Sequence, residues 1–207
     1  MTITYKTGDI LLYHGTRSYV DKFLECAEPS QYSHASMVIV IPNIAFSDTT
    51  LPEGVYVIES TQSVHPDAED HLKKLGVQMT KIEDVLSERG QTIYHRSLKC
   101  ERDDIFYIKL RAAHLKVHGL PYDLDIGDWI NAASRSWCGL LCCCKTQKTD
   151  KFWCSALVAY LYVQLGFLPK STPWTDVSPR DLGTEKGTYL LNFHHCNLAD
   201  EVLLSIN

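Results

Sequence analysis

The stretch "KFWCSALVAYLY" at residues 151–162 places one cysteine, Cys154, at the front of an apolar run with helical character. A cysteine hydrolase needs a thiolate, a base that forms it and a third group that orients the base. The unpaired N–H groups and the dipole of a helix N-terminus favour a thiolate, and the same N–H groups could stabilise an oxyanion. Cys154 is therefore a candidate nucleophile, with Trp153 and Ser155 beside it as candidate substrate-binding residues.

Candidates for the base and the orienting group lie on two predicted strands. His34 comes directly before the apolar, β-branched run "ASMVIVI", which predicts a buried strand ended by Pro42. Glu59 lies at the C-terminal end of the next predicted strand, "VYVIES". If the two strands pair antiparallel around the turn-rich segment 43–54, His34 and Glu59 become cross-strand neighbours. Glu59 could then accept from one ring nitrogen and leave the other for Cys154.

Each of these residues also has an ordinary structural interpretation. Free cysteines are among the most buried residue types, so Cys154 could simply pack in the core. A histidine beside a strand is often a structural group with its hydrogen bonds satisfied, and a glutamate at a strand end is usually solvated. Five further histidines compete for the role of base: His14, His114, His118, His194 and His195.

The periodicity of apolar residues predicts an α+β fold, in which a small antiparallel sheet packs against two main helices. Strands or strand-like segments are predicted at 10–13, 33–41, 55–60, the first part of 77–86, 92–98 and within the tail 188–206.

One main helix is predicted over 101–119 and the other from Cys154 to Gly166. Asp103 or Asp104 can cap the first helix. Its expected core stripe is Ile105, Ile108, Ala112 and Leu115. The expected core face of the second helix is Leu157, Val158, Leu161 and Leu165.

Several segments follow one another in an order typical of one enzyme family. They are "GDILLY", "YSHASMVI", "VYVIES", "GLPYD" and "FWCSALV", followed by the loop "SPRDL". From Gly8 to about Leu182, the chain resembles the permuted branch of the NlpC-type papain-like hydrolases. This is the YiiX-like group, which includes poxvirus-type members and is related to lecithin:retinol acyltransferase.

The resemblance implies a catalytic triad in permuted order, with the histidine and the acid ahead of the cysteine. It makes Cys154 the nucleophile, His34 the general base and Glu59 the orienting acid. The implied fold is a circularly permuted papain-like domain spanning residues 1–207, with a small β-barrel-like sheet beside the helix that carries the nucleophile.

The resemblance also implies residues that shape or line the site. They are Tyr122 and Asp123 in "PYD", and Tyr32 and Ser33 ahead of the histidine. One departure from the family pattern is Ala156, where other members often have an acid after "CS". This position carries none of the three catalytic roles.

A second departure is a cysteine-rich insertion at about 136–150, "SWCGLLCCCKTQK" with its flanks. Apolar side chains, cysteines and lysines together are typical of a loop that is S-palmitoylated or contacts a membrane, here through residues 137–148. A packed loop with free thiols is an alternative. A zinc site is a third interpretation, although the spacing matches no paired-ligand pattern. Its candidate ligands are Cys138, Cys142 and Cys144 with Cys196 or His194.

Composition excludes some classes of protein. The chain has 207 residues, 45% of them hydrophobic and 22% charged, which is ordinary for a globular protein. A formal net charge of -5 gives no basic surface for nucleic acid. The first residues, "MTITYKTGDI", are not a secretory signal, and 8 cysteines with three adjacent to one another favour free thiols in a reducing compartment. We therefore expect a cytoplasmic protein, with membrane or virion association as the alternative.

Three functions remain open from the sequence. The first is a cysteine hydrolase or acyltransferase that forms a thioester at Cys154 and needs no cofactor or metal; an acyl-lipid or N-acyl substrate is preferred, and a peptide-like amide is the alternative. The second is a binding or virion structural module that keeps the fold without turnover. The third is a regulatory thiol protein that senses oxidants through Cys142, Cys143 and Cys144.

Overall fold

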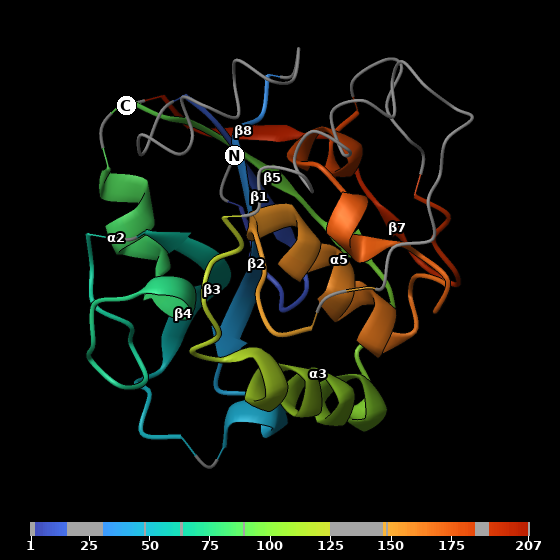
Figure 1. Ribbon diagram of the computed structural model, residues 1–207, viewed down its shortest axis with the longest axis horizontal. Helices are drawn as coiled ribbons and strands as arrows, with labels where there is room; N and C mark the ends of the chain where they lie inside the picture. The colour runs from blue at the N-terminus through green and yellow to red at the C-terminus, as the bar shows by residue number, and fades with distance from the viewer. Residues whose placement is uncertain are drawn as a thin grey trace.

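A six-stranded sheet organises the molecule, with its strands in the order β4-β3-β2-β1-β5-β8 (Figure 1). The computed structural model describes residues 3–15, 31–47, 49–62, 64–88, 90–124, 147, 149–184 and 191–206. Within them the large sheet consists of β1 (Ile10–His14), β2 (His34–Ile41), β3 (Gly54–Gln62), β4 (Leu75–Lys81), β5 (Thr92–Arg96) and β8 (Val202–Ile206). A second, two-stranded sheet pairs β6 (Leu98–Lys99) with β7 (Asn197–Leu198).

Every pair of neighbouring strands in these sheets is antiparallel. This confirms the α+β class and the antiparallel sheet predicted from the apolar periodicity. The predicted strand over 92–98 divides into β5 and β6, and the predicted tail strands are β7 and β8. A circularly permuted papain-like order and a single domain remain predictions.

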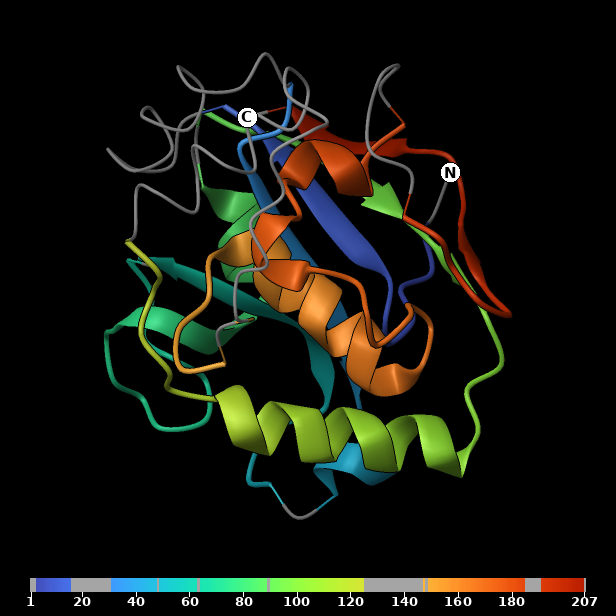
Figure 2. The same ribbon diagram turned by 45° about the vertical axis from the view of Figure 1, so that its right-hand side comes forward.

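Apolar side chains cover both faces of the large sheet. Alternation sends one set of side chains toward helices α3 (Asp104–Val117) and α5 (Cys154–Leu165), where they form the larger core. The other set packs with the short helix α2 (Ile82–Ser87) in a smaller core. Figure 2 shows α5 lying across the strands, with α3 running past their ends. Three 3₁₀ turns complete the description: Ile44–Phe46, Trp174–Asp176 and Pro179–Leu182.

Helix α5 is buried along nearly its whole length because it lies between the sheet, α3 and the C-terminal turns. The predicted core residues Leu157, Val158, Leu161 and Leu165 are all buried. The helix ends at Gly166, whose φ of 85° is the left-handed conformation that glycine adopts most easily at this position. Both predicted ends of this helix are therefore confirmed.

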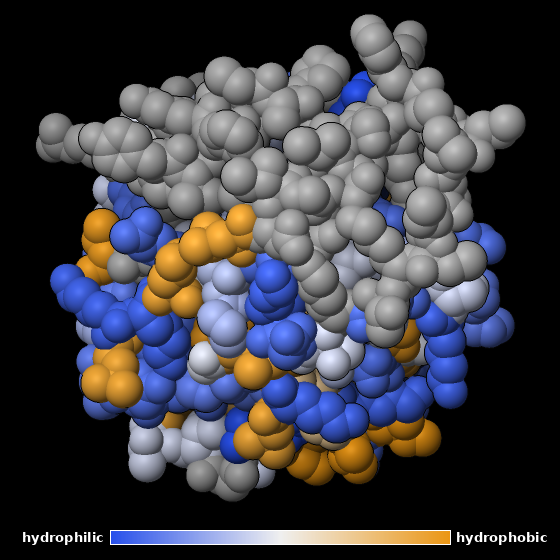
Figure 3. All heavy atoms as spheres, in the orientation of Figure 1, coloured by the Kyte–Doolittle hydropathy of each residue, from blue (hydrophilic) through white to orange (hydrophobic). Residues whose placement is uncertain are grey.

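Helix α3 corrects one prediction. Asp103 is its cap, accepting a hydrogen bond from the Phe106 N–H. The predicted core stripe is wrong, because its four members are exposed: Ile105, Ile108, Ala112 and Leu115. The side of α3 that packs inward carries Phe106, Leu110, Ala113 and Val117. Two apolar stripes lie on one helix, and periodicity alone could not say which of them meets the core. Apolar side chains gather along the lower edge of Figure 3, in the region where Figure 1 places α3.

The segment after α3 joins that helix to the sheet and to α5. Pro121 forms a β-bridge with Gly76 at the start of β4, and Tyr122 forms another with Phe152. Gly76 has a φ of 150°, and a Cβ there would lie 2.1 Å from the Leu120 carbonyl oxygen, so this close approach requires glycine. Pro121 and Tyr122 thus connect the end of α3 to β4 and to Phe152, two positions before Cys154.

The cysteine-rich stretch 137–146 lies outside the described residues. The membrane, palmitoylation and zinc interpretations of that stretch therefore stay predictions. Among the residues that the structure does describe, no helix has both the length and the apolar character needed to cross a bilayer.

Candidate active site

His34 and Glu59 meet as the strand pairing predicted. His34 is the first residue of β2, and β2 pairs with β3 so that Met37 lies opposite Ile58. Extending that register puts Glu59 diagonally across from His34 on the same face. The His34 Nε2–H donates to Glu59 Oε2 over 2.9 Å. Both side chains are almost completely buried, with 3% and 0% exposed, so solvent screens this pair little.

Cys154 completes the group from the start of α5. Its sulfur lies close enough to the His34 ring to raise the pKa of that imidazole. Because Nε2 is engaged with Glu59, Nδ1 is the ring nitrogen left for the sulfur. Burial alone would lower the pKa of His34, but the adjoining Cys154 sulfur and the Glu59 carboxylate outweigh it and raise this pKa to about 10. The imidazole is therefore held in its protonated form at neutral pH.

A second row of side chains, on β4, holds Glu59 in place. The Thr80 hydroxyl donates to Glu59 Oε1 over 2.9 Å, so each carboxylate oxygen has its own donor. Gln78 lies directly opposite Glu59, and its Nε2 donates to the Thr80 hydroxyl over 3.4 Å. The chain of bonds runs from Gln78 through Thr80 and Glu59 to His34, and it is entirely buried.

The sequence analysis did not identify Thr80 or Gln78. A usable signal was present in "VQMTK", where two polar residues alternate with apolar ones on a predicted strand. Because Val77 and Met79 face the larger core, Gln78 and Thr80 must face the opposite side together. Here that side is also buried, and buried polar side chains at alternate positions need polar partners.

Backbone contacts fix the first turn of α5. Trp153 is the N-cap residue, and no side chain described caps the helix, so its first N–H groups are not taken by a capping oxygen. The Ser60 hydroxyl, on β3, donates to the Phe152 carbonyl over 2.6 Å. The Ser155 hydroxyl donates to the Val177 carbonyl over 2.7 Å. The nucleophile position is thus tied to the strand of Glu59 on one side and to the C-terminal turns on the other.

The other predicted site residues lie around this group with different contacts. Ser33 donates its hydroxyl to the Gly15 carbonyl over 2.7 Å, which fixes the backbone beside His34. Tyr32 packs edge-on against Tyr94, with ring centroids 5.8 Å apart. Tyr122 and Trp153 are buried next to the bridge at Phe152.

The hydroxyls of Ser33 and Ser155 are committed to backbone carbonyls, so their contacts are those of positioning residues. Asp123 forms an ion pair with Lys151, with 2.8 Å between Oδ1 and Nζ. Substrate binding by Tyr32, Ser33, Tyr122, Trp153 and Ser155 stays a prediction.

The competing histidines lie elsewhere. His14 contacts the Gln31 carbonyl, and His194 and His195 are exposed on the segment before β7. His114 and His118 belong to a separate carboxylate cluster. The other two described cysteines, Cys100 and Cys196, are free thiols whose pKa values are raised mainly by burial, that of Cys196 to about 12. Of the described cysteines, Cys154 is the one whose sulfur raises the pKa of a histidine.

Comparisons with known proteins found similar solved structures but no matching family. No protein-family model matches the chain, and no curated protein matches it. Among solved structures, the metalloprotein yiiX from Escherichia coli O157:H7 is similar at a TM-score of 0.46 and 18% sequence identity, with 98% of this chain and 97% of that chain covered. The function is therefore argued from the contacts of Cys154, His34 and Glu59 themselves.

Proposed function

We propose that the protein is a cysteine hydrolase or acyltransferase that acts on an amide or ester carbonyl. The observation that carries the proposal is the buried chain from Thr80 through Glu59 and His34 to Cys154. It supplies a nucleophile, a base and an orienting acid, the three parts that nucleophilic catalysis requires. Cys154 also lies at a helix N-terminus, where the dipole favours a sulfur anion.

The reaction follows from these roles. The Cys154 sulfur attacks the carbonyl carbon, and a tetrahedral oxyanion forms near the first N–H groups of α5. The intermediate collapses to a thioester as the carbon–nitrogen or carbon–oxygen bond breaks, and His34 gives its proton to the leaving group. A water or another acceptor then attacks the thioester, His34 takes the proton from it, and the carbon–sulfur bond breaks to release the Cys154 sulfur as a thiolate beside the imidazolium. Glu59 keeps the imidazole oriented throughout.

The preferred substrate class is an acyl-lipid or N-acyl compound, and a peptide-like amide is the alternative. The preference rests on the apolar and cysteine-rich composition of residues 137–148, which favours contact with a lipid surface. A panel of p-nitrophenyl esters of increasing acyl length, run beside peptide amides, separates the two classes. A lipid substrate predicts kcat/KM that rises with chain length.

The first experiment is alkylation of each cysteine by low-dose iodoacetamide across pH, read by peptide mass spectrometry. A free thiol reacts as it ionises near pH ~8.5, whereas Cys154 should be labelled fastest and already at acidic to neutral pH. His34→Ala should abolish that early labelling, and His194→Ala, an exposed histidine, should leave it unchanged. If Cys154 stays inert in the wild type while Cys142, Cys143 and Cys144 take the label, the proposal is wrong.

Turnover provides the second test. Cys154→Ala should lower kcat/KM on any substrate found by at least ~10³-fold, because the nucleophile is lost. Cys100→Ala, which removes a half-buried thiol with no histidine partner among the described residues, is the matched control and should keep full activity. Equal activity in both variants would exclude a thioester mechanism at Cys154.

Burial favours one second candidate, a non-catalytic binding or structural module with the same fold. The exposed fraction is 2% for Cys154, 3% for His34 and 0% for Glu59. A group so enclosed can serve as a polar connection between α5 and the sheet. In that case Cys154→Ala would lower the unfolding midpoint, and no acyl substrate or activity-based acyl probe would label the wild type.

A further inference from the structure

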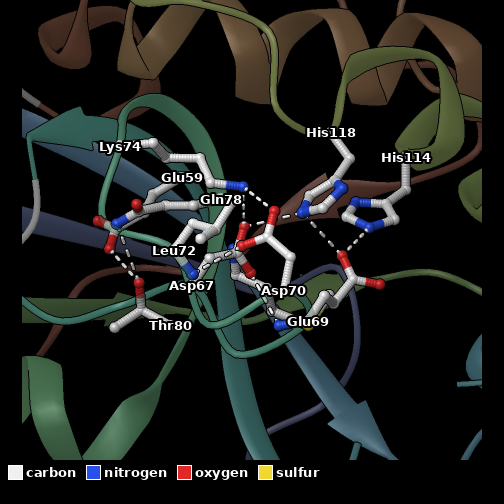
Figure 4. A network of polar contacts seen from close by, with 11 residues as sticks. Glu59, Asp67, Glu69, Asp70, Leu72, Lys74, Gln78, Thr80, His114 and His118 are labelled. Carbon is white, nitrogen blue, oxygen red and sulfur yellow. Dashed lines mark hydrogen bonds and ion pairs between the residues drawn. The ribbon is translucent and has the colours of Figure 1, made fainter. Parts of the chain in front are cut away.

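A second histidine cluster lies where the C-terminal half of α3 meets the loop between β3 and β4. His114 on α3 and His118, the residue that caps the C-terminal end of α3, point toward Glu69 and Asp67 of that loop (Figure 4). The His114 Nε2 lies 2.6 Å from Glu69 Oε2, and the His118 Nε2 lies 3.2 Å from the same oxygen. One carboxylate oxygen therefore faces two imidazole nitrogens.

The residue types and their spacing are those of a transition-metal site. Histidines four positions apart lie one above the other on the same face of a helix. Two imidazoles and a carboxylate suit Zn²⁺ better than Mg²⁺ or Ca²⁺, which take oxygen ligands. The donor atoms of Glu69, His114 and His118 all lie within 4.8 Å of one another.

The present distances also fit an ion after a small adjustment. Zinc bonds of about 2.0–2.2 Å in a tetrahedral site place neighbouring donors roughly 3.3–3.6 Å apart. The His118–Glu69 separation of 3.2 Å is nearly at that value, and the His114–Glu69 separation of 2.6 Å needs to open by less than ~1 Å. The ion would replace the proton that now lies between a histidine nitrogen and the Glu69 oxygen, and it would bind both atoms.

Neighbouring charged groups compete with this arrangement. Asp67 Oδ2 lies 2.8 Å from the His118 Nε2, so Asp67 competes with an ion for that nitrogen. Lys74 already bonds Asp67 and Asp70, and Arg111 lies 3.7 Å from the second oxygen of Glu69. The second ring nitrogen of His114, Nδ1, is buried and has no hydrogen-bond partner among the described residues. Nδ1 is not the ring nitrogen that faces Glu69, so it takes no part in the proposed site.

We propose that Glu69, His114 and His118 form a structural zinc site that fastens the β3–β4 loop to α3. The loop is already joined to β4, since Asp67 Oδ1 accepts from the Met79 N–H and Ala68 donates to the Met79 carbonyl. An ion would therefore connect α3 to β4 through this loop. The same end of α3 continues into the Pro121 and Tyr122 bridges, so the site also stabilises the residues that pair with Phe152, two positions before Cys154.

Zinc binding by the full-length, chelator-treated protein tests the proposal. The cysteine-rich stretch could bind zinc by itself, so the background for every measurement carries Cys138, Cys142, Cys143 and Cys144 changed to serine. We expect this protein to bind one equivalent of Zn²⁺ in a calorimetric titration, and its thermal unfolding midpoint to rise with added zinc but not with Mg²⁺. Binding of no zinc in this background would overturn the site.

Matched variants then assign the ligands. In the same background, Glu69→Gln and His118→Ala should each weaken zinc binding by about 100-fold or more and remove the thermal shift, because each loses a ligand. His194→Ala, which removes an exposed histidine outside the cluster, should bind as the background does. Circular dichroism establishes that each variant is folded, and Glu69→Gln preserves side-chain shape if His118→Ala does not fold. Wild-type-like binding in both ligand variants would refute the assignment.

Cobalt distinguishes this cluster from a thiolate site. Co²⁺ bound by imidazole and carboxylate shows only weak ligand-field bands. A thiolate ligand adds an intense sulfur-to-cobalt charge-transfer band. The background protein should show the first spectrum; the second would place the ion on one of the remaining cysteines and overturn the proposal.

Discussion

Two clusters of this protein pair histidine with carboxylate at similar distances, yet their surroundings differ. His34 and Glu59 are 2.9 Å apart, and His118 and Asp67 are 2.8 Å apart. In the first cluster the histidine has a thiol as its other partner. In the second, the carboxylates face two histidines, a lysine and an arginine. The histidine–carboxylate pair is common to both, so the third partner decides the chemistry that each can support.

Enclosure is the other difference between the clusters. In the first cluster every side chain is buried, and the contacts form one line with a thiol at its end. The members of this line are Gln78, Thr80, Glu59, His34 and Cys154. The second cluster is partly open, with His118 24% and Lys74 17% exposed. In the first cluster each side chain bonds the next one in line, an arrangement that orients one reactive atom. In the second cluster several ligand atoms converge on one point, which is better suited to hold an ion.

The largest effect that separates the clusters concerns the pH dependence of stability at His34. The pKa of His34 is about 10 in the folded protein and 6.5 as the reference value, so the folded state binds the additional proton between these values. The contribution of His34 to the free energy of unfolding is fully present below pH 6.5 and is lost as pH rises through 10. Urea unfolding gives the free energy of unfolding of the wild type and of His34→Gln at each pH. The difference between the two should shrink by on the order of 2–5 kcal/mol over that window.

A control refines this measurement. Cys154→Ala removes one of the two groups that raise the pKa of His34, so the window should become narrower and end at a lower pH. His194→Gln, at an exposed position, should follow the wild type at every pH. If the free energies of unfolding of the wild type and His34→Gln differed by the same amount from pH 6 to 10, that would contradict a buried imidazolium.

The next effect concerns the orienting acid. Glu59→Gln keeps the shape of the side chain but removes the charge that stabilises the imidazolium, and kcat/KM should fall by about 10–100-fold. Glu83→Gln, on the exposed side of α2, is the matched control and should leave kcat/KM unchanged. Early alkylation of Cys154 should weaken in step with activity. Full activity in Glu59→Gln would show that Glu59 only fills space.

A smaller effect is expected from Thr80, which acts on the base through Glu59 and is therefore a positioning residue. Thr80→Val removes the hydroxyl at nearly constant volume, and kcat/KM should fall by about 3–10-fold. The pH profile of Cys154 alkylation should shift at the same time. Thr80→Ser restores the hydroxyl and should recover both, whereas a shortfall that persists in Thr80→Ser would indicate a packing effect.

The smallest effect belongs to the second cluster. Lys74→Met removes two partly exposed ion pairs, one to Asp67 and one to Asp70. Asp67 keeps its bonds to His118 and to backbone N–H groups, so the free energy of unfolding should fall by only about 1 kcal/mol. The pH profile of Cys154 alkylation should stay unchanged, because Lys74 makes no described contact with the first cluster. A shifted profile would show that the two clusters are electrostatically coupled.

Local patterns predicted much of this fold correctly. Runs of β-branched residues identified β2 and β3, and alternation placed Val55, Val57 and Glu59 on one face of β3. The apolar run after Cys154 identified α5 from its first residue to Gly166. These patterns succeed because secondary structure and burial periodicity depend on near neighbours in the chain.

Choices between equivalent local patterns could not be made in the same way. Helix α3 carries two apolar stripes, and only packing against α5 and the Ile44–Phe46 turn buries the stripe that contains Phe106 and Leu110. Thr80 and Gln78 gain a role only because β4 pairs with β3 in one register. A shift of one residue would turn both side chains to the other face.

The sequence by itself determined which residues could do chemistry: one cysteine at a helix start, one histidine at a strand start and one acid on the following strand. Residue type and short-range periodicity set these candidates. Only the tertiary structure decided that His34, rather than His114 or His118, meets Cys154, although the two residues are far apart in the chain. Strand order, register and the position of α5 on the sheet are long-range properties. They are fixed because both faces of the sheet must be buried at the same time.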